Sequence, residues 1–505
     1  MLFAEVVAVS AAVSGTSSRT AKVAALAALL RALAEEEIEP AVAWLAGEPR
    51  QRRLGVGWRS LSGLAVPASA EPSLGVADVD ELLAGLAGST GGGSAARRSE
   101  LLIGLFGAAT VGEQGFLRRL ITAELRQGAL EGVLTEAVAS ASGVGPALVR
   151  RGLMLSGSLP ATARAALAGG AEAVAAFQLR VGRGVRPMLA SPAKSLDEAL
   201  GGAEAEQDSR LSGITVEYKL DGARIQVHRD GDRVWVFTRT LRDITSDVPE
   251  LVEMALRLPC RAVVLDGESL ALTDDGRPRP FQETMSNSSV GLRTPRFFDC
   301  LHLDGRDLLD EPLRERLYAL SKVAGDLQMP GISEPTAEQA ADLLDQVLAE
   351  GHEGVMVKTL EDPYAAGRRG KSWRKVKPVH TLDLVVLAAE WGYGRRTGLL
   401  SNIHLGARDP DGGPPVMVGK TFKGMTDELL AWQTDQFSAR ALADNGHVAT
   451  LPPEFVVEIA LDGVQTSTRY PGGIALRFAR VLRYRPDKTP AEADTIDAVR
   501  ALKSG

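Results

Sequence analysis

The residues best suited to chemistry lie on short strands that end in turns. Residues 216–224 read VEYKLDGAR, an apolar strand that runs into a turn. Side chains alternate faces along a strand, so Glu217 and Lys219 point the same way. A neutral amine in a fixed position is a competent nucleophile. A lone lysine on a strand is more often a solvated surface residue, so a nucleophilic role for Lys219 depends on what accompanies it.

Three further segments accompany this lysine in a fixed order. LDGE, residues 265–268, places two carboxylates on one strand face, EGVMVK, residues 353–358, ends a strand in a lysine, and WRKVK, residues 373–377, puts two ammonium groups on one face. Each segment alone has an ordinary structural explanation. All four in this order have a much smaller chance of coincidence, which favours a site built from amines and carboxylates.

The spacing within EGVMVK constrains its geometry. Met356 and Lys358 share a face of the expected strand, which suits contacts with a base and with a phosphate. Glu353 lies five residues before Lys358 and would fall on the opposite face of a continuous strand. We therefore expect Glu353 in the turn before the strand if both residues line one site.

The elements that must position these residues change along the chain. From about residue 20 to 180, Ala and Leu recur at helical spacing, which predicts an all-α region. GSTGGGSAARR, residues 88–98, is interpreted as a glycine-rich loop between two helices of one domain, because the helical pattern resumes after it. From about residue 186, strands of period 2 predominate, beginning with a hairpin at an Asp-Gly turn, residues 230–231.

The remaining chain divides into two strand-rich regions. Helical stretches at 311–324 and 337–350 interrupt the strands of the first, which is an α+β pattern. After residue 383 short strands return, including ALRFARVLRY at 475–484, with one helix near 427–442, and a small β-barrel fits best. At roughly 150 residues per domain, the chain is long enough for about three. We predict a multidomain protein with an all-α domain at 1–180, an α+β domain at 186–381 and a β-barrel domain at 382–505.

Composition bounds the class of protein. Hydrophobic residues make up 45% and charged residues 24%, which is ordinary for a globular chain. Two cysteines cannot build a four-cysteine zinc site and are compatible with a reducing cytosol. No apolar run approaches the ~20 residues that span a bilayer. The apolar N-terminus carries Glu5 and no basic residue, so we expect an amphipathic first helix there rather than a signal peptide.

The charge is unevenly distributed. A net charge of -7 taken alone disfavours a nucleic-acid partner. Residues 368–380 nevertheless carry six Lys or Arg and no acid, and residues 465–488 carry six against one Asp. Charges more than about 8 to 10 Å apart are largely screened at physiological salt, so an anionic ligand would sense these local runs rather than the average.

Together the motifs resemble the covalent nucleotidyltransferase superfamily and, within it, the three-domain ATP-dependent DNA ligases. EYKLDGAR is similar to the nucleophile motif of that family and FTRTLRDIT to the arginine motif that follows it. LDGE, FFDCLHLDG, EGVMVK and WRKVKP are similar to the next four motifs, and RPDK at 485–488 to the last. PMLA at 187–190 resembles the start of the adenylation domain, and FLRRLITAELRQGALEGV resembles the helical DNA-binding domain. The resemblance covers nearly the whole chain.

The resemblance implies a DNA ligase that uses ATP and Mg²⁺ and acts on nicked double-stranded DNA. Lys219 would attack the α-phosphate of ATP, expel pyrophosphate, and carry AMP until it passes to the 5′ phosphate of the nick. The barrel would be an OB-fold, and all three domains would encircle the duplex. The helical domain would grip phosphates with helix N-termini and backbone amides, including the glycines at 88–93. Such an enzyme is expected to be a cytoplasmic, nucleoid-associated monomer in DNA repair, replication or recombination, with no membrane partner.

The family resemblance also implies a nucleotide pocket. Glu217 would read the adenine amino group, Phe298 would stack on one face of the base, and Met356 would cover the other. Because Phe298 follows another phenylalanine, only one of the two can face the pocket. Arg224 and Arg239 would hold the ribose or the 5′ phosphate of the nick, and either assignment of the two is open.

Charged groups would complete that site. Lys358 would contact phosphate, while Lys375 and Lys377 would favour the neutral amine of the nucleophile and stabilise the phosphate in the transition state. Glu268 and Glu353 are the expected Mg²⁺ carboxylates, since magnesium prefers oxygen ligands and water.

The last motif lies in the barrel. Arg485 and Lys488, with Asp487 between them, look like the group that orients pyrophosphate in the family. Pro486 is a small departure from the commonest pattern and leaves the Arg and Lys in place. This role implies that the barrel closes over ATP for the first step and then swings away to grip DNA.

Four alternatives compete with this interpretation. An NAD⁺-dependent ligase would bring a cysteine zinc module, which two cysteines cannot supply. A capping enzyme, which uses GTP, has no use for a helical domain before the nucleophile, and an RNA ligase would usually be shorter and lack that domain. An inert DNA-end-binding scaffold is disfavoured by the intact set of Lys219, Glu268, Glu353, Lys375 and Lys377.

Overall fold

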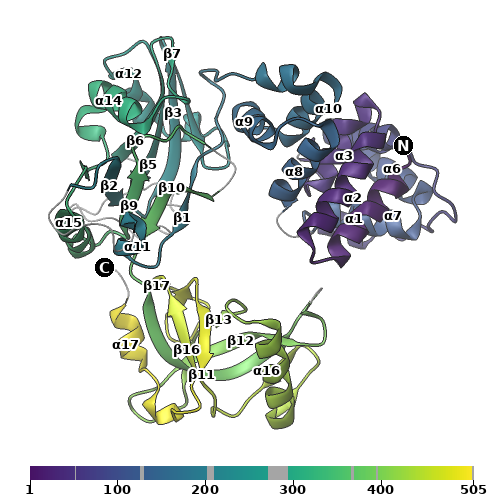
Figure 1. The fold of residues 1–505 in the computed structure, drawn as a ribbon. Coiled ribbons are helices and arrows are strands. Elements are labelled where there is room, and N and C mark those ends of the chain that lie inside the picture. Colours follow the sequence, from purple (N-terminus) through teal and green to yellow (C-terminus); the bar gives the residue numbers. More distant parts are fainter. Residues whose placement is uncertain are drawn as a thin grey trace.

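The computed structural model describes most of the chain. It covers residues 1–51, 53–125, 130–201, 210–270, 294–365, 369–393 and 396–502. Residues 126–129 and 368, which belong to two of the sequence motifs, lie outside the described residues. The N-terminal helices, the strands and helices that follow, and the strand-rich C-terminal part form separate bodies (Figure 1). The predicted multidomain architecture, with a helical N-terminal region and two sheet-rich regions, is confirmed at this level.

The N-terminal region packs its helices around one apolar core. Phe3 is fully buried in this core, with its ring edge-on to Trp44 and Phe116 at centroid distances of 5.4 and 5.6 Å. Every regular element described between residues 3 and 175 is a helix. The helices are α1 (Phe3–Gly15), α2 (Arg19–Ala32), α3 (Glu35–Leu45), α4 (Trp58–Ser62), α5 (Val76–Gly88), α6 (Ser94–Ala108), α7 (Val111–Ile121), α8 (Leu130–Ser142), α9 (Pro146–Ser156) and α10 (Leu159–Ala175).

The glycine-rich segment at 88–98 connects α5 to α6, and these two helices share that core, as predicted. Leu86 of α5 and Leu102 of α6 are both buried in it. Gly91 and Gly93 have φ angles of 77° and 74°, in the left-handed region that favours glycine. The segment is therefore a turn inside one body and does not separate two.

The middle region contains two five-stranded sheets. The first has the order β1 (Leu189–Pro192), β10 (Arg369–Val376), β9 (Gly354–Thr359), β2 (Ile214–Lys219) and β8 (Gly331–Ser333). The second has the order β4 (Arg233–Thr238), β3 (Ala223–Asp230), β5 (Ala262–Leu270), β6 (Thr294–Leu303) and β7 (Arg306–Asp307). One apolar core takes side chains from both sheets, so the sheets pack against each other. The helices of this region are α11 (Leu196–Leu200), α12 (Pro249–Leu256), α14 (Leu313–Ala324) and α15 (Ala337–Ala349).

The sequence predictions for this region hold with small shifts. The helices predicted at 311–324 and 337–350 are α14 and α15. In the hairpin of β3 and β4, Asp230 pairs with Arg233, so the turn is formed by Gly231 and Asp232, one residue later than predicted. The φ angle of Gly231 is 59°, which explains why a glycine stands there.

The C-terminal region is built on a seven-stranded sheet with a separate two-stranded ribbon. The helix predicted near 427–442 is α16 (Asp427–Arg440), and α17 (Ile496–Ala501) lies near the end of the chain. The sheet contains β11 (His380–Trp391), β12 (Leu400–Ala407), β13 (Val416–Thr421), β14 (Ala443–Asp444), β15 (Val448–Thr450), β16 (Val456–Leu461) and β19 (Arg480–Tyr484), and the ribbon pairs β17 (Gly463–Thr466) with β18 (Ile474–Arg477).

The prediction of one continuous strand at 475–484 is wrong, because the strand is interrupted at Phe478. This residue has a φ angle of 54°, in the left-handed region. The break lets β18 pair with β17 while β19 pairs with β16. An alternating pattern of apolar and polar residues contains no signal for such a break, because pairing with other strands decides it.

None of the described helices is long and apolar enough to cross a bilayer.

A buried ion pair fixes α14 on the second sheet. The Asp299 carboxylate on β6 accepts hydrogen bonds from Nε and Nη2 of Arg316 at 2.7 and 3.1 Å, and neither side chain is exposed. Arg316 Nη1 also donates to the carbonyl oxygens of Glu311 and Asp362 at 2.7 and 3.0 Å. Removing one partner of such a pair leaves a buried charge without compensation.

We expect Asp299→Ala to destabilise the protein strongly. The isolated Arg316 charge should lower the free energy of unfolding by about 3 to 5 kcal/mol, measured by calorimetry or denaturant titration. Asp307→Ala is the control, because its carboxylate is half exposed and its ion pair among the described residues is with His302. A loss for Asp299→Ala no larger than that of the control would contradict this account.

Candidate active site

Lys219 ends β2 and forms an ion pair with Glu353. Both side chains are 19% exposed. Glu353 precedes β9, and its backbone N–H donates to the Lys219 carbonyl oxygen at 3.2 Å. The structure therefore places Glu353 in the turn before the strand, as the face argument requires. Attack by the Lys219 amine requires this ion pair to open.

A second lysine shares the Glu353 carboxylate. Lys377, just after β10, lies 3.4 Å from Glu353 and 2.6 Å from Asp462. Burial alone would raise the pKa of Glu353, but the positive charges of Lys219 and Lys377 outweigh burial and hold that pKa below its ordinary value. The site therefore keeps Glu353 ionised between two ammonium groups.

Glu268 lies on β5, and its side chain makes no hydrogen bond or ion pair with another described residue. Burial raises its pKa to about 7, against the opposing charges of Arg224 and Lys219. Asp266, on the same strand face, is instead bound to Arg224.

Glu268 and Glu353 are the carboxylates that could hold a magnesium ion. Glu268 is close enough to Lys219 for their charges to interact, and Glu353 is ionised beside the same amine. No group of three or more His, Cys, Asp and Glu placed to hold a metal occurs within the described ranges. Magnesium does not require such a group, since it keeps several water ligands and often takes only one or two protein carboxylates.

The predicted nucleotide-binding residues meet between the two sheets. Lys358 Nζ lies 2.5 Å from Glu217 Oε2 and 3.3 Å from the Phe298 carbonyl oxygen. The same ammonium lies 4.7 Å from the Phe298 ring centroid and 4.6 Å from that of Trp373. Met356 pairs with Glu217 across the strands. Four of the predicted nucleotide-binding residues therefore lie together: Glu217, Phe298, Met356 and Lys358. Trp373 lies beside them.

Lys375 belongs to the same neighbourhood through strand pairing. It lies on β10 directly opposite Met356 of β9. Its backbone carbonyl accepts a hydrogen bond from Ala193 at 3.0 Å, next to β1. The Lys-x-Lys pattern thus places Lys375 opposite Met356 and Lys377 beside Glu353, the partner of Lys219.

Two adjacent phenylalanines divide their roles by strand alternation. Phe297 is fully buried in the core between the second sheet and helices α12 and α14. Phe298 belongs to the core between the two sheets, where its ring lies edge-on to Trp373 at 5.7 Å. Only Phe298 therefore faces the pocket.

The two predicted arginines have different surroundings. The Arg224 guanidinium donates to Asp266 twice, at 3.1 and 2.7 Å, and to the Met188 carbonyl oxygen at 2.7 Å. Tyr364 donates to the same Asp266 carboxylate at 2.6 Å. Arg239 follows β4, is exposed, and contacts no other predicted site residue in the described part of the chain.

The last motif is held within the barrel region. Arg485 and Lys488 both bind Asp383, at 3.1 and 2.6 Å. Neither forms an ion pair with the groups around Lys219 in the described structure. The sequence motif predicts that both residues belong to the nucleotide site, whereas in this arrangement of the barrel they lie outside it.

A different part of the barrel meets the nucleophile region. Arg477 binds Asp221 of the KLDG turn at 2.8 Å, and Asp462 binds Lys377. Phe478 is 57% exposed, and the ammonium groups of Lys377 and Lys423 lie 5.9 and 5.4 Å from its ring.

Sequence reasoning missed these barrel residues. The basic run at 465–488 contains Arg477 and Phe478 and could have indicated them, whereas no pattern distinguishes Asp462. Trp373 and Asp266 were also missed as site residues, although each shares a strand face with a residue that was chosen.

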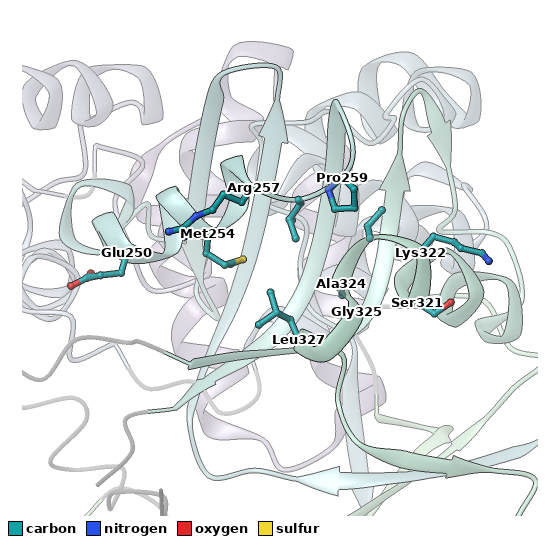
Figure 2. A pocket seen from close by; sticks show the side chains of 11 residues that line it. Glu250, Met254, Arg257, Pro259, Ser321, Lys322, Ala324, Gly325 and Leu327 are labelled. Carbon is teal, nitrogen blue, oxygen red and sulfur yellow. The ribbon is translucent and has the colours of Figure 1, made fainter. Parts of the chain in front are cut away.

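A separate cleft of about 880 Å³ lies between α12 and the end of α14 (Figure 2). Met254 and Leu327 lie in it, with Arg257 and Lys322 on opposite sides. None of the predicted site residues lines this cleft. The candidate active site is therefore the cluster around Lys219 and not this hollow.

Comparisons with known proteins agree with the site. Residues 64–139 match the family description "DNA ligase N terminus", residues 187–377 "ATP dependent DNA ligase domain", and residues 396–488 "ATP dependent DNA ligase C terminal region". A protein of Saccharopolyspora erythraea named "Probable DNA ligase" is 62% identical over 100% of this chain and 98% of its own length. Another of that name from Rhodococcus jostii is 61% identical over the full length of both chains.

A solved structure shares the fold. "Pmar-Lig_PreS3" aligns with a TM-score of 0.60 at 18% identity, over 96% of this chain and 100% of its own. The chain belongs to the ATP-dependent DNA ligase family. It is an ATP-dependent ligase of DNA, so the NAD⁺-dependent, capping, RNA-ligase and inert-scaffold interpretations are set aside. Roles in DNA repair, replication and recombination are typical of this family.

We expect Phe298→Ala to weaken ATP binding and Phe297→Ala to weaken the fold. Loss of base stacking at Phe298 should raise the KM for ATP in self-adenylation by an amount equivalent to roughly 1 to 3 kcal/mol. Phe297→Ala should lower the melting temperature, because removing a buried phenylalanine costs about 3 to 5 kcal/mol. The reverse assignment of KM and melting temperature would show that the face of β6 is wrongly identified.

Proposed function

We propose that the protein seals nicks in double-stranded DNA through AMP carried on Lys219. The observation that carries this proposal is the Lys219 amine at the end of β2, ion-paired with Glu353 beside the second lysine Lys377. When the pair opens, the amine attacks the α-phosphorus of ATP, and the bond to pyrophosphate breaks. AMP then passes to the 5′ phosphate of the nick, and attack by the 3′ hydroxyl releases AMP.

The base pocket supports ATP as the nucleotide. Adenine would stack on Phe298 with Met356 on its other side, and Glu217 would accept a hydrogen bond from the adenine amino group. Lys358 now occupies the face of Phe298 and pairs with Glu217. A bound base would displace this ammonium, which then becomes available to a phosphate.

The surrounding charges support phosphate transfer. Glu268 and Glu353 would hold Mg²⁺, which neutralises phosphate charge when bound. Lys375 and Lys377 would stabilise the negative charge that develops at phosphorus. Opening of the Lys219–Glu353 pair is then favoured by any cation that competes for Glu353.

The arginines would divide between nucleotide and DNA. Arg224 is held by Asp266, and its guanidinium carbon lies 5.3 Å from the Phe298 ring centroid, which suits a contact with the ribose. Arg239 is exposed beyond β4 and suits the 5′ phosphate of the nick. Phe478, exposed between two lysines, suits contact with the duplex itself.

The barrel would serve two steps in turn. We assign an all-α DNA-binding domain to residues 1–180, an adenylation domain to 186–381 and an OB-fold to 382–505, acting as a monomer on the nucleoid in the cytoplasm. Arg485 and Lys488 would leave Asp383 and orient pyrophosphate when the barrel closes over ATP. The contacts of Arg477 and Asp462 with the nucleophile region would belong to the other arrangement.

We expect Lys219→Ala and Lys219→Arg both to abolish self-adenylation while the fold is kept. Arginine stays protonated in proteins and cannot supply a neutral nucleophile. Intact mass after incubation with ATP and Mg²⁺ should show the addition of one AMP to the wild type and none to either variant. The adduct should disappear when nicked duplex is added. An arginine variant that still took up AMP would rule out the nucleophile assignment.

We expect Arg485→Ala with Lys488→Ala to separate the first step from the last. The double variant should lose most self-adenylation, because the charges that orient pyrophosphate are gone. It should retain sealing of a chemically pre-adenylylated nick better than sealing that starts from ATP. Equal loss on the two substrates would mean that the motif serves DNA binding instead.

A further inference from the structure

The segment between α10 and β1 is fastened to the second sheet. The Gly182 N–H donates to Nδ1 of His228 at 3.1 Å. Val185 is bound at both polar atoms by the Gln226 side chain, with its N–H donating to Oε1 at 2.7 Å and its carbonyl accepting from Nε2 at 2.9 Å. His228 and Gln226 are buried on β3. The segment therefore has a fixed place on β3 and β4.

A tight turn within this segment presents two arginines. The Arg183 N–H donates to the Arg180 carbonyl oxygen at 3.0 Å, which places the two residues at the ends of one turn. Gly182 has a φ angle of 85°, and a Cβ there would lie 3.0 Å from the Trp235 ring. Only glycine combines this backbone conformation with so close an approach.

Neither of the two arginines forms an ion pair with a described acid. Within the described ranges no carboxylate lies within 4.0 Å of either guanidinium, whereas Arg186 nearby pairs with Glu131. The Arg183 Nε is buried without a hydrogen-bond partner among described atoms, and its Nη2 donates to the Gln178 carbonyl oxygen at 3.0 Å. Burial and the charge of Arg180 lower the pKa of Arg183, as expected for a cation that lacks an anion.

A third cation lies on the same ring. The Arg233 guanidinium carbon is 4.8 Å from the centroid of Trp235. Side chains at 233, 235, 237 and 239 share one face of β4 by alternation, and a Cβ at Gly184 would lie 3.3 Å from Phe237 on that face. The turn therefore packs on the face of β4 that carries the side chains at 235 and 237, and by alternation Arg239 continues that face. Asp232 directly precedes Arg233 in the sequence, and it is exposed in the hairpin turn.

We propose that Arg180 and Arg183, with Arg233, bind the phosphate backbone of duplex DNA outside the reacting centre. This inference rests on the proposed function, because it assumes that DNA passes the site. Guanidinium groups pair with phosphate oxygens in a fixed geometry, and backbone contacts set the register of a protein on a duplex. A turn already held by His228 and Gln226 loses little conformational freedom on binding.

The salt dependence of DNA binding tests the proposal. The probe is a nicked duplex that lacks the 5′ phosphate, so that binding reaches equilibrium without sealing. Each phosphate contact contributes about 0.9 to the slope of log K against log salt concentration. Arg180→Ala with Arg183→Ala should therefore reduce the slope by about 2 and weaken binding at physiological salt. Self-adenylation, measured without DNA, should stay at the wild-type level.

Matched variants separate a site from a general charge effect. Arg257→Ala with Arg306→Ala removes two exposed charges from the same region, and the slope should not change. Arg180→Lys with Arg183→Lys keeps both charges and should restore most of the slope. Gly182→Ala removes no charge but displaces the turn, and it should lower the affinity.

Two results would overturn the proposal. An unchanged slope in the Arg180 and Arg183 double variant would show that these arginines contact no phosphate. An equal loss in the Arg257 and Arg306 variant would show an effect of net charge alone. Failure of the proposed function would look different, since the wild-type protein would then take up no AMP from ATP.

Discussion

The ion pair between Lys219 and Glu353 is the interaction on which the rest of the site depends. It joins the end of β2 to the turn before β9, and Lys377 from the end of β10 shares the same carboxylate. The end of β2, the start of β9 and the end of β10 therefore meet at one small cluster of charge. In the proposed mechanism this pair opens before Lys219 attacks, and a cation that competes for Glu353 favours the opening. Activation and substrate binding are, in that mechanism, linked by electrostatics within a few residues.

The same logic holds in the base pocket. Lys358 pairs with Glu217 and lies over the rings of Phe298 and Trp373, where a nucleotide base would stack. A cation over an aromatic face is a favourable contact, so Lys358 stabilises the two rings on which the proposed base would stack. Arg224 also lies against the Phe298 ring, and it is held by Asp266, which accepts a hydrogen bond from Tyr364. In the proposed mechanism, binding of the base exchanges the contacts of Lys358 for contacts with the nucleotide.

Strand alternation explains how much the sequence could predict. It placed Glu217 with Lys219, separated Phe297 from Phe298, and required Glu353 to precede its strand, because each of these depends only on local geometry. It could not show that Asp266 binds Arg224, or that Phe478 breaks a strand, since the partners come from distant segments. The position of Arg485 and Lys488 depends on how a whole domain is oriented, which no local pattern contains.

The contact of Arg485 and Lys488 with Asp383 has a consequence for the direction of the reaction. The group proposed to orient pyrophosphate is neutralised by a carboxylate at the start of the barrel and held apart from Lys219. A protein in this arrangement that already carried AMP would have nothing to position pyrophosphate for the reverse attack. The adenylylated enzyme would then be protected from regenerating ATP while it searches the chromosome for a nick. By holding Arg485 and Lys488 away from Lys219, Asp383 would slow the reverse reaction and so preserve the AMP adduct until DNA binds.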